Sequence, residues 1–245
     1  MIEMPIPDAG VLERRAEIVA ALRRILSETD GPREGVIDDE LERRAYESDA
    51  LTAYRTLPMV VVLPETTEQV ARILRYCNAA GVKIVPRGAG TSLSGGALPL
   101  ADGVLLGLGK FKRILEIDVA NRCAVVQPGV TNLAITQAVQ DQGFYYAPDP
   151  SSQIACTIGG NVAENSGGVH CLKYGLTTNN VIGIEMVTMD GEIMRLGGKH
   201  LDSGGYDLLG VMIGSEGLLG VVTEVTVRIL PKPPNARALL IGPLQ

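Results

Sequence analysis

The order of apolar and polar residues predicts a chain in which helices and strands are mixed. Apolar positions recur at helical spacing over residues 11–27. They do so again after Thr66, which with Gln69 has the spacing of a capping box, and this second helix is expected to end at Gly81. Short apolar runs at 58–64, 82–85 and 104–108 predict strands, so that residues 58–85 form a strand–helix–strand unit. The polar stretch from 31 to 54 is expected to be irregular, with one helical turn.

The pattern changes after residue 110. Residues 114–118 and 123–127 predict paired strands, residues 132–142 a helix, and residues 182–189 and 192–196 a hairpin around Asp190-Gly191. A further helix is predicted at 207–213, and the period-two alternation of 221–230 indicates a half-buried strand. Residues 144–180, rich in Gly, Asn, Ser and Pro, are expected to hold little regular structure.

These elements predict an α+β fold with two lobes. A small α/β lobe would span residues 55–109 and a larger, mixed and mostly antiparallel lobe residues 110–234. A helical segment at 1–54 would precede them, and residues 235–245 would begin a further, truncated region.

Composition narrows the class of protein. The chain has 245 residues, of which 46% are hydrophobic and 20% charged, as in a globular protein with a core. A net charge of −6 and an aromatic content of 4% argue against a nucleic-acid partner. No uncharged apolar run approaches the ~18 residues of a membrane span, and the N-terminus lacks the pattern of a secretory signal. Scattered cysteines and only two histidines lead us to expect reduced thiols in the cytoplasm and no metal site.

Residues 86–96, PRGAGTSLSGG, are the first segment that points to chemistry. They follow a predicted strand, and glycines let backbone N–H groups approach an anion closely. Arg87 adds a charge whose donors match phosphate oxygens. The segment fits neither the P-loop pattern nor the dinucleotide fingerprint, because Leu93 stands where the fingerprint has its third glycine. It is interpreted as a phosphate cradle for a nucleotide-type cofactor, with a flexible surface loop as the alternative.

Two further glycine-rich clusters lie at 148–175 and 214–223. Ordered loops of this kind often wrap a ligand, and three of them predict one extended ligand. The motifs PRGAGTSLSGG, PDPSS, TIGGNVAENSGG and GSEGLLGVVTE, in this order, resemble the PCMH-type FAD-binding domain of the vanillyl-alcohol-oxidase type of flavoprotein. Within that group the sequence is most similar to the flavin subunit of glycolate oxidase and to D-lactate and D-2-hydroxyglutarate dehydrogenases, over about residues 40–235.

The resemblance implies a set of cofactor-binding residues. The first loop would hold the FAD pyrophosphate, the second cluster would line the flavin and its ribityl chain, and Val222 would approach the adenine or pyrophosphate side through its backbone. The set is Arg87, Gly88, Ala89, Gly90, Thr91, Ser92, Gly95, Gly96, Pro148, Asp149, Thr157, Gly159, Gly160, Asn161, Ser166, Gly167 and Val222.

The resemblance also bears on how the cofactor is attached and on the catalytic base. Some relatives attach FAD covalently through a histidine in the first loop, where this chain has Thr91, so non-covalent FAD is expected. No catalytic residue is assigned. His170 is a candidate acid/base or substrate contact, as are Asn165 and Lys173, and the alternative for His170 is a histidine held by local hydrogen bonds. Glu164 and Glu216 are interpreted as structural.

The implied activity is FAD-dependent oxidation of a small 2-hydroxy acid, of the glycolate or D-lactate type, to the 2-oxo acid. The electrons would pass to a companion flavin or iron–sulfur subunit or to a quinone, and the protein would be cytoplasmic or held at the inner membrane through partner subunits. Two alternatives stay open: a non-catalytic flavin-binding or assembly subunit or fragment, and a transferase similar to alkyl-glycerone-phosphate synthase. In relatives a substrate-covering domain follows the last predicted strand, and this chain stops soon after it.

Overall fold

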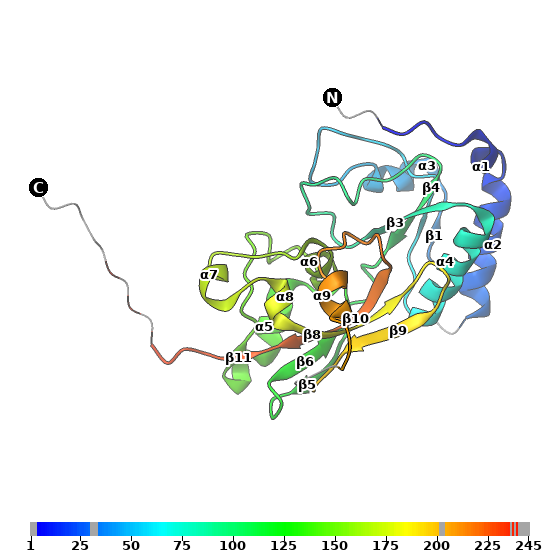
Figure 1. The fold of residues 1–245 in the computed structure, drawn as a ribbon. Coiled ribbons are helices and arrows are strands. Elements are labelled where there is room, and N and C mark those ends of the chain that lie inside the picture. The colour runs from blue at the N-terminus through cyan, green and yellow to red at the C-terminus, as the bar shows by residue number, and fades with distance from the viewer. Residues whose placement is uncertain (1–3, 30–33, 201–203, 236, 238, 240–245) are drawn as a thin grey trace, which may run out of the picture.

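The structure is a computed structural model that describes residues 4–29, 34–200, 204–235, 237 and 239. It contains two main sheets, one of four and one of five strands, with helices packed around them (Figure 1). A short two-stranded pairing joins β7 (Phe144–Tyr145) to β11 (Leu230–Pro231). Among the described residues, no helix has both the length and the apolar character that crossing a membrane requires.

The four-stranded sheet has the order β1-β2-β4-β3. Its strands are β1 (Val36–Ile37), β2 (Val60–Val62), β3 (Lys83–Arg87) and β4 (Gly103–Gly107). β2 and β3 are both parallel to β4, which lies between them, whereas β1 is antiparallel to β2. The predicted strand–helix–strand unit is present, but its two strands are separated by a strand that comes later in the chain. β3 ends at Arg87, so the sheet delivers the chain directly into the glycine-rich loop.

Helix α4 (Thr67–Ala80) forms where the capping and apolar signals predicted it. The Thr66 hydroxyl accepts the Gln69 N–H at 3.2 Å, and the Gln69 side chain accepts the N–H of Glu65 rather than that of Thr66. Gly81 ends the helix in the left-handed conformation, φ +66°. Its buried stripe packs with α2 (Arg15–Glu28) and the four-stranded sheet into one hydrophobic core.

The five-stranded sheet is antiparallel, with the order β5-β6-β10-β8-β9. Its strands are β5 (Ile114–Asp118), β6 (Cys123–Val126), β8 (Val181–Val187), β9 (Ile193–Gly197) and β10 (Val221–Arg228). The two predicted hairpins are confirmed as β5–β6 and β8–β9, and β10 pairs with both of them from the centre. A second core lies between this sheet and helices α5 (Asn132–Val139), α6 (Ile158–Glu164) and α9 (Leu208–Met212).

Helix α4 connects the two sheets. At its start, the Thr67 hydroxyl donates to the buried carboxylate of Glu185 on β8 at 2.9 Å. Glu185 also accepts the Thr223 hydroxyl of β10 at 2.9 Å and pairs with Arg195 of β9. Further along α4, Arg75 donates to the carbonyls of the hairpin turn at 190–191. These contacts fix the small sheet relative to the large one.

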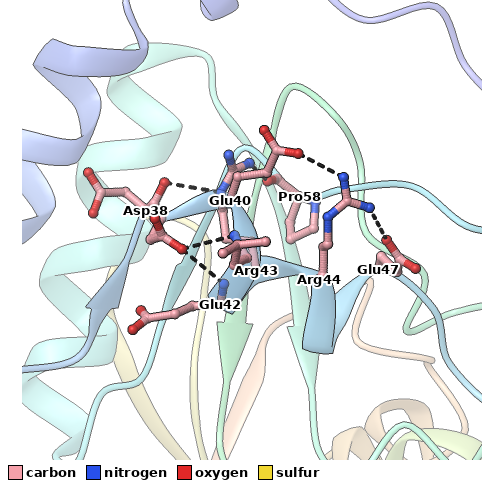
Figure 2. Close-up of polar contacts among 9 residues, drawn as sticks. Asp38, Glu40, Glu42, Arg43, Arg44, Glu47 and Pro58 are labelled. Atoms are coloured by element: carbon pink, nitrogen blue, oxygen red, sulfur yellow. Dashed lines mark hydrogen bonds and ion pairs between the residues drawn. The ribbon is translucent and has the colours of Figure 1, made fainter.

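The segment before β2 is anchored by Arg43, which donates to two backbone carbonyls, and is stiffened by the ion pairs of Arg44. Figure 2 shows Arg43, in α3 (Glu40–Arg43), and Arg44, which opens a 3₁₀ turn (Arg44–Tyr46). Arg43 reaches the Asp38 and Pro58 carbonyls at 3.2 and 2.5 Å, and Arg44 pairs with Glu40 at 2.8 Å. Burial and a neighbouring arginine lower the pKa of Arg43. The backbone up to Tyr46 is therefore held on the body of the protein.

Three sequence-based predictions differ from the structure. The helix predicted over 11–27 is broken at Arg14 into α1 (Ala9–Glu13) and α2, because Arg14 leaves the helical conformation at φ −88° and ψ 7°. The stretch predicted as irregular at 31–54 holds its helical turn but also strand β1; residues 31–33 lie outside the described ranges. Residues 144–180 contain α6, α7 (Cys171–Tyr174) and α8 (Thr177–Asn180), so this region is more regular than predicted.

Candidate functional site

A cavity of about 330 Å³ lies where the three glycine-rich segments meet. One wall is the loop after β3, a second is α6 with the residues that precede it, and the third is the turn between α9 and β10 together with the first residues of β10. The walls come from both sheets and lie far apart in the sequence. This volume falls within the range of pockets that bind small molecules and cofactors.

The first wall offers backbone donors. The N–H groups of residues 88–92 form no hydrogen bond with any acceptor in the described part of the chain. Gly90 has φ +69°, a conformation that an L side chain rarely adopts, so the turn depends on glycine there. Successive unpaired N–H groups in a turn of this kind are typical of an anion-binding loop. The loop predicted as a cradle is thus a cavity wall with unpaired N–H groups, and phosphate binding there stays a prediction.

The second wall, α6, forms despite two adjacent glycines because its neighbours stabilise it. Ile158 and Val162 are fully buried in the second core. At its C-terminal end, the N–H groups of Gly214 and Glu216 donate to the Val162 and Ala163 carbonyls at 2.8 and 2.9 Å. The third wall therefore caps the second, and the two form as a unit.

A buried hydroxyl lies between the first two walls. Thr157 precedes α6, is 6% exposed, and its Oγ1 has no hydrogen-bond partner among the described residues. Oγ1 lies 2.3 Å from the point where a Cβ on Gly88 would stand, so a side chain at position 88 would force the Thr157 hydroxyl to move. An unpaired buried hydroxyl is costly unless a ligand or water completes it. Thr157 is thus a second donor beside the loop.

Arg87 lines the cavity, and its guanidinium also contacts the protein behind the loop. Its Nη1 donates to the Tyr46 carbonyl at 3.1 Å, and its guanidinium packs under the loop, 2.6 Å from the point where a Gly90 Cβ would stand. Burial lowers the pKa of Arg87, and the charge of Asp49 acts in the opposite direction. The guanidinium is thus engaged on the protein side of the loop.

The structure brings most of the sequence-predicted residues to this cavity. Its lining includes residues 87–92, Gly96, Thr157, residues 159–161, Ser166 and Val222. It does not include Gly95, Pro148, Asp149 or Gly167. The Pro148 carbonyl accepts the side chain of Asn132 at 2.8 Å, and Gly167 packs so closely on Leu176 that a Cβ would lie 2.5 Å from it.

Asn161 has a structural contact as well as its place in the lining. Its side-chain amide donates to Asn132 at 2.9 Å, which extends the buried chain that ends at Pro148. Gly159 likewise has a packing reason, because a Cβ there would lie 2.6 Å from Pro128. These two residues shape the wall whatever ligand it holds.

His170 lies outside the cavity lining and is exposed. Its side chain is 64% exposed, and its Nδ1 lies 2.6 Å from an Asp149 carboxylate oxygen. The Asp149 carboxylate also accepts the His170 N–H at 3.2 Å. The pair ties the segment that leads into α7 to residues 148–150. Among the described residues, no group of three or more His, Cys, Asp and Glu side chains could hold a metal ion.

Several lining residues were not in the predicted set. Pro128 and Met212 contribute apolar surface, Cys156 precedes the buried threonine, and residues 215–217 form the turn that caps α6. Glu216, in that turn, has φ +53°, a strained conformation for a residue with a side chain. The third glycine cluster carried this signal, but only Val222 was assigned from it.

The sequence of this chain matches a known family and several known proteins. A sequence model of the family described as "FAD binding domain" matches residues 58–197. Glycolate oxidase subunit GlcD of Escherichia coli K12 is 58% identical over 226 residues, which is 92% of this chain and 44% of that protein. The subunit of the same name from Bacillus subtilis is 45% identical over 91% of this chain and 47% of its own length.

Other similar proteins are more distant. D-lactate dehydrogenase of Archaeoglobus fulgidus is 41% identical over 74% of this chain and 41% of its own. A solved structure of an alkyldihydroxyacetonephosphate synthase superposes with a TM-score of 0.77 over 96% of this chain and 42% of that one, at 23% identity. This last likeness speaks for the fold alone. The chain spans less than half the length of each of these relatives.

Proposed function

This chain belongs to the FAD binding domain family, and from that premise we propose that it is the flavin-binding part of an oxidoreductase for small 2-hydroxy acids. The observation that carries the proposal is the 58% identity to a glycolate oxidase subunit over 92% of the chain. The named relatives act on glycolate or D-lactate, so the expected substrate is an acid of that type.

FAD fits the residues that line the cavity. Its pyrophosphate is an extended row of anionic acceptors, and the loop at 88–92 offers a row of free N–H donors. The Thr157 hydroxyl, buried and otherwise unpaired, adds a donor next to that loop. Gly88 leaves the space in which this hydroxyl and the loop backbone meet. We therefore assign diphosphate binding to these groups.

When bound, FAD supplies the two-electron acceptor for oxidation of the substrate, and the protein supplies binding, orientation and exclusion of water. The buried side chains of Met212 and Val221 add apolar surface to the lining, which favours a planar ring over solvent. We assign no catalytic base in this chain, because His170, the candidate acid/base, lies outside the lining and is paired with Asp149.

We propose that FAD is held without a covalent bond. Thr91 stands in the loop where a histidine link would be expected, and none of the residues that line the cavity is a histidine. Precipitation of the reconstituted protein with acid should release all the yellow colour to the supernatant. Colour that stays in the pellet would show a covalent link and contradict this part of the proposal.

Anaerobic titration tests the activity. The protein reconstituted with FAD is mixed with glycolate or D-lactate, with L-lactate as the matched control acid. Bleaching of the visible flavin band by glycolate or D-lactate supports a 2-hydroxy-acid oxidoreductase. A bound flavin that none of the acids reduces would refute activity in this chain and favour a flavin-binding subunit. Failure to bind FAD at all would remove the cofactor assignment itself.

We also propose that the protein works with companion chains, because the two relatives of highest identity named above are subunits. A flavin or iron–sulfur chain that accepts electrons is the expected companion. Affinity purification from the native cells, followed by iron and flavin analysis of what copurifies, tests this. A purified protein without companion chains, iron or a second flavin would contradict it.

A further inference from the structure

The proposed cofactor loop rests on a segment that precedes the family match. The match begins at residue 58, whereas residues 46–51 lie directly behind the loop. The Ala50 N–H donates to the Gly90 carbonyl at 2.9 Å, and Leu51 lies 3.1 Å from the point where a Gly95 Cβ would stand. This backing segment, residues 46–51, therefore contacts the loop at two places.

Arg87 ties the loop to the backing segment. Its guanidinium donates to the Tyr46 carbonyl and lies so close to Gly90, which has φ +69°, that a Cβ there would stand 2.6 Å from it. Tyr46 ends the 3₁₀ turn that Arg43 and Arg44 anchor in Figure 2. The backbone that carries this carbonyl is thus held by contacts of the neighbouring residues Arg43 and Arg44. A cation placed this way holds the loop from the protein side.

Asp49 is the counter-charge. It is 6% exposed, one carboxylate oxygen accepts the Leu51 N–H at 2.8 Å, and the other has no hydrogen-bond partner among the described residues. Its charge favours the ionised form of Arg87, which burial disfavours. A buried carboxylate with a free oxygen is costly unless a cation compensates it. The charge of Asp49 therefore acts on Arg87 from a distance, because the two form no direct ion pair in the described part of the chain, while its side chain orders the backbone at Leu51, one residue after the Ala50 N–H that contacts Gly90.

We propose that Arg87 and Asp49 are positioning residues for the cofactor: they fix the loop at 88–92 so that its N–H groups converge on the FAD diphosphate. Arg87 then acts through the loop backbone rather than through direct contact with phosphate. The inference rests on the proposed FAD function, and it adds residues 46–51 to the cofactor site.

Positioning and direct phosphate contact predict opposite effects of one substitution on FAD affinity. Asp49→Asn removes a negative charge near an anionic ligand, so electrostatics alone predicts tighter FAD binding. Positioning predicts weaker binding, by about 3- to 10-fold, because the guanidinium loses its compensating charge and moves toward solvent. Arg87→Ala should weaken binding by about 10- to 100-fold, and Arg87→Lys should recover only part of that loss, since an ammonium lacks the planar, forked donors of a guanidinium.

A measurement without FAD tests the positioning directly. Hydrogen exchange of the Ala50 amide in the cofactor-free protein reports on its bond to Gly90. It should accelerate at least tenfold in Arg87→Ala and in Asp49→Asn, and stay unchanged in the control Arg24→Gln, whose side chain is 69% exposed on α2.

The outcomes distinguish the two levels of the proposal. Wild-type protein that binds no FAD overturns the proposed function. Hydrogen exchange of the Ala50 amide still tests whether Arg87 and Asp49 position the loop. If wild-type protein binds FAD and the hydrogen exchange of the Ala50 amide is unchanged in both variants, only the positioning role of Arg87 and Asp49 is overturned. Tighter FAD binding in Asp49→Asn, with unchanged exchange, would instead assign Arg87 to direct contact with the phosphates.

Discussion

Replacing Thr157 by Val should raise the stability of the cofactor-free protein and lower its affinity for FAD. Val keeps the β-branched shape and suits the extended backbone of Thr157, φ −97° and ψ 152°. The hydroxyl is buried and has no partner in the described part of the chain, so it costs the free protein about 1–3 kcal/mol, of which we expect about 1 kcal/mol to be recovered. The substitution removes no hydrogen bond among the residues that the structure describes, so nothing there offsets this gain.

When FAD is bound, the same substitution is expected to lower the stability of the protein. A hydrogen bond from the hydroxyl to a charged phosphate is worth about 1.5–3 kcal/mol, so the dissociation constant should rise about 10- to 100-fold. Without FAD, the variant should melt about 2–4 °C above wild type. At high FAD concentration it should melt below wild type, because a more weakly bound ligand stabilises the folded protein less. Denaturant unfolding of the free protein and titration of FAD fluorescence measure the two terms separately.

Thr66→Val is the matched control. Thr66 also precedes a helix, but its hydroxyl accepts the Gln69 N–H, and it lies outside the cavity lining. The control should lose about 1 kcal/mol of stability and keep its FAD affinity. An unchanged FAD affinity in Thr157→Val would refute the assignment of this hydroxyl to the cofactor. A loss of stability in the free protein would show that the hydroxyl has a partner there.

Three other results are expected from the packing and the charges. Glu185→Leu should lower the free energy of unfolding by about 2–4 kcal/mol, because two threonine hydroxyls and Arg195 lose their shared acceptor. Glu185→Gln should lower it by less. Equal losses for the two variants in urea unfolding would contradict this expectation. The Asp118 carboxylate accepts hydrogen bonds from the Asn121 side chain and backbone and from Lys199, which lowers its pKa from 3.8 to about 2. Its stabilisation is therefore present above about pH 3.8 and is lost as the pH falls through about 2. Asp118→Asn should flatten the fall in stability over that interval, and a profile parallel to wild type in acid unfolding would count against it. Burial raises the pKa of Cys77 to about 12, so this thiol should resist alkylation in native protein at pH 8 and react after unfolding; mass spectrometry of the labelled peptides would reveal early modification, the contrary result.

The sequence was most informative where local signals and tertiary structure agree. Thr66 and Gly81 set the ends of α4, and the alternation of 221–230 appears as the buried and part-buried residues of β10. The hairpin at Asp190-Gly191 has its glycine at φ +74°. Each of these elements carries its own boundary signals, so no distant contact is needed to place it.

Other features depend on contacts that a sequence does not display. β1 has two residues and exists because it pairs with β2. Helix α6 has two glycines directly after its first residue, which disfavour a helix, and the turn at 214–216 caps its end. The position of Arg87 could not be predicted, because the Tyr46 carbonyl that it contacts is set by the fold of another segment. The glycine-rich loops indicated where the cavity lies. Of its third wall, only Val222 was predicted, although residues 215–217 also line it.

The place of β10 in the large sheet affects how the protein is made. β10 is the last strand of that sheet to be synthesised, and yet it is the central one, so Val225 pairs with Val126 on one side and Ile184 on the other. Until it emerges from the ribosome, β6 and β8 each expose an unpaired edge next to an apolar face, the state in which nascent chains aggregate or recruit chaperones. The turn that completes the cavity immediately precedes this strand. Cofactor capture therefore follows the closure of the sheet, after the chain has been synthesised through β10.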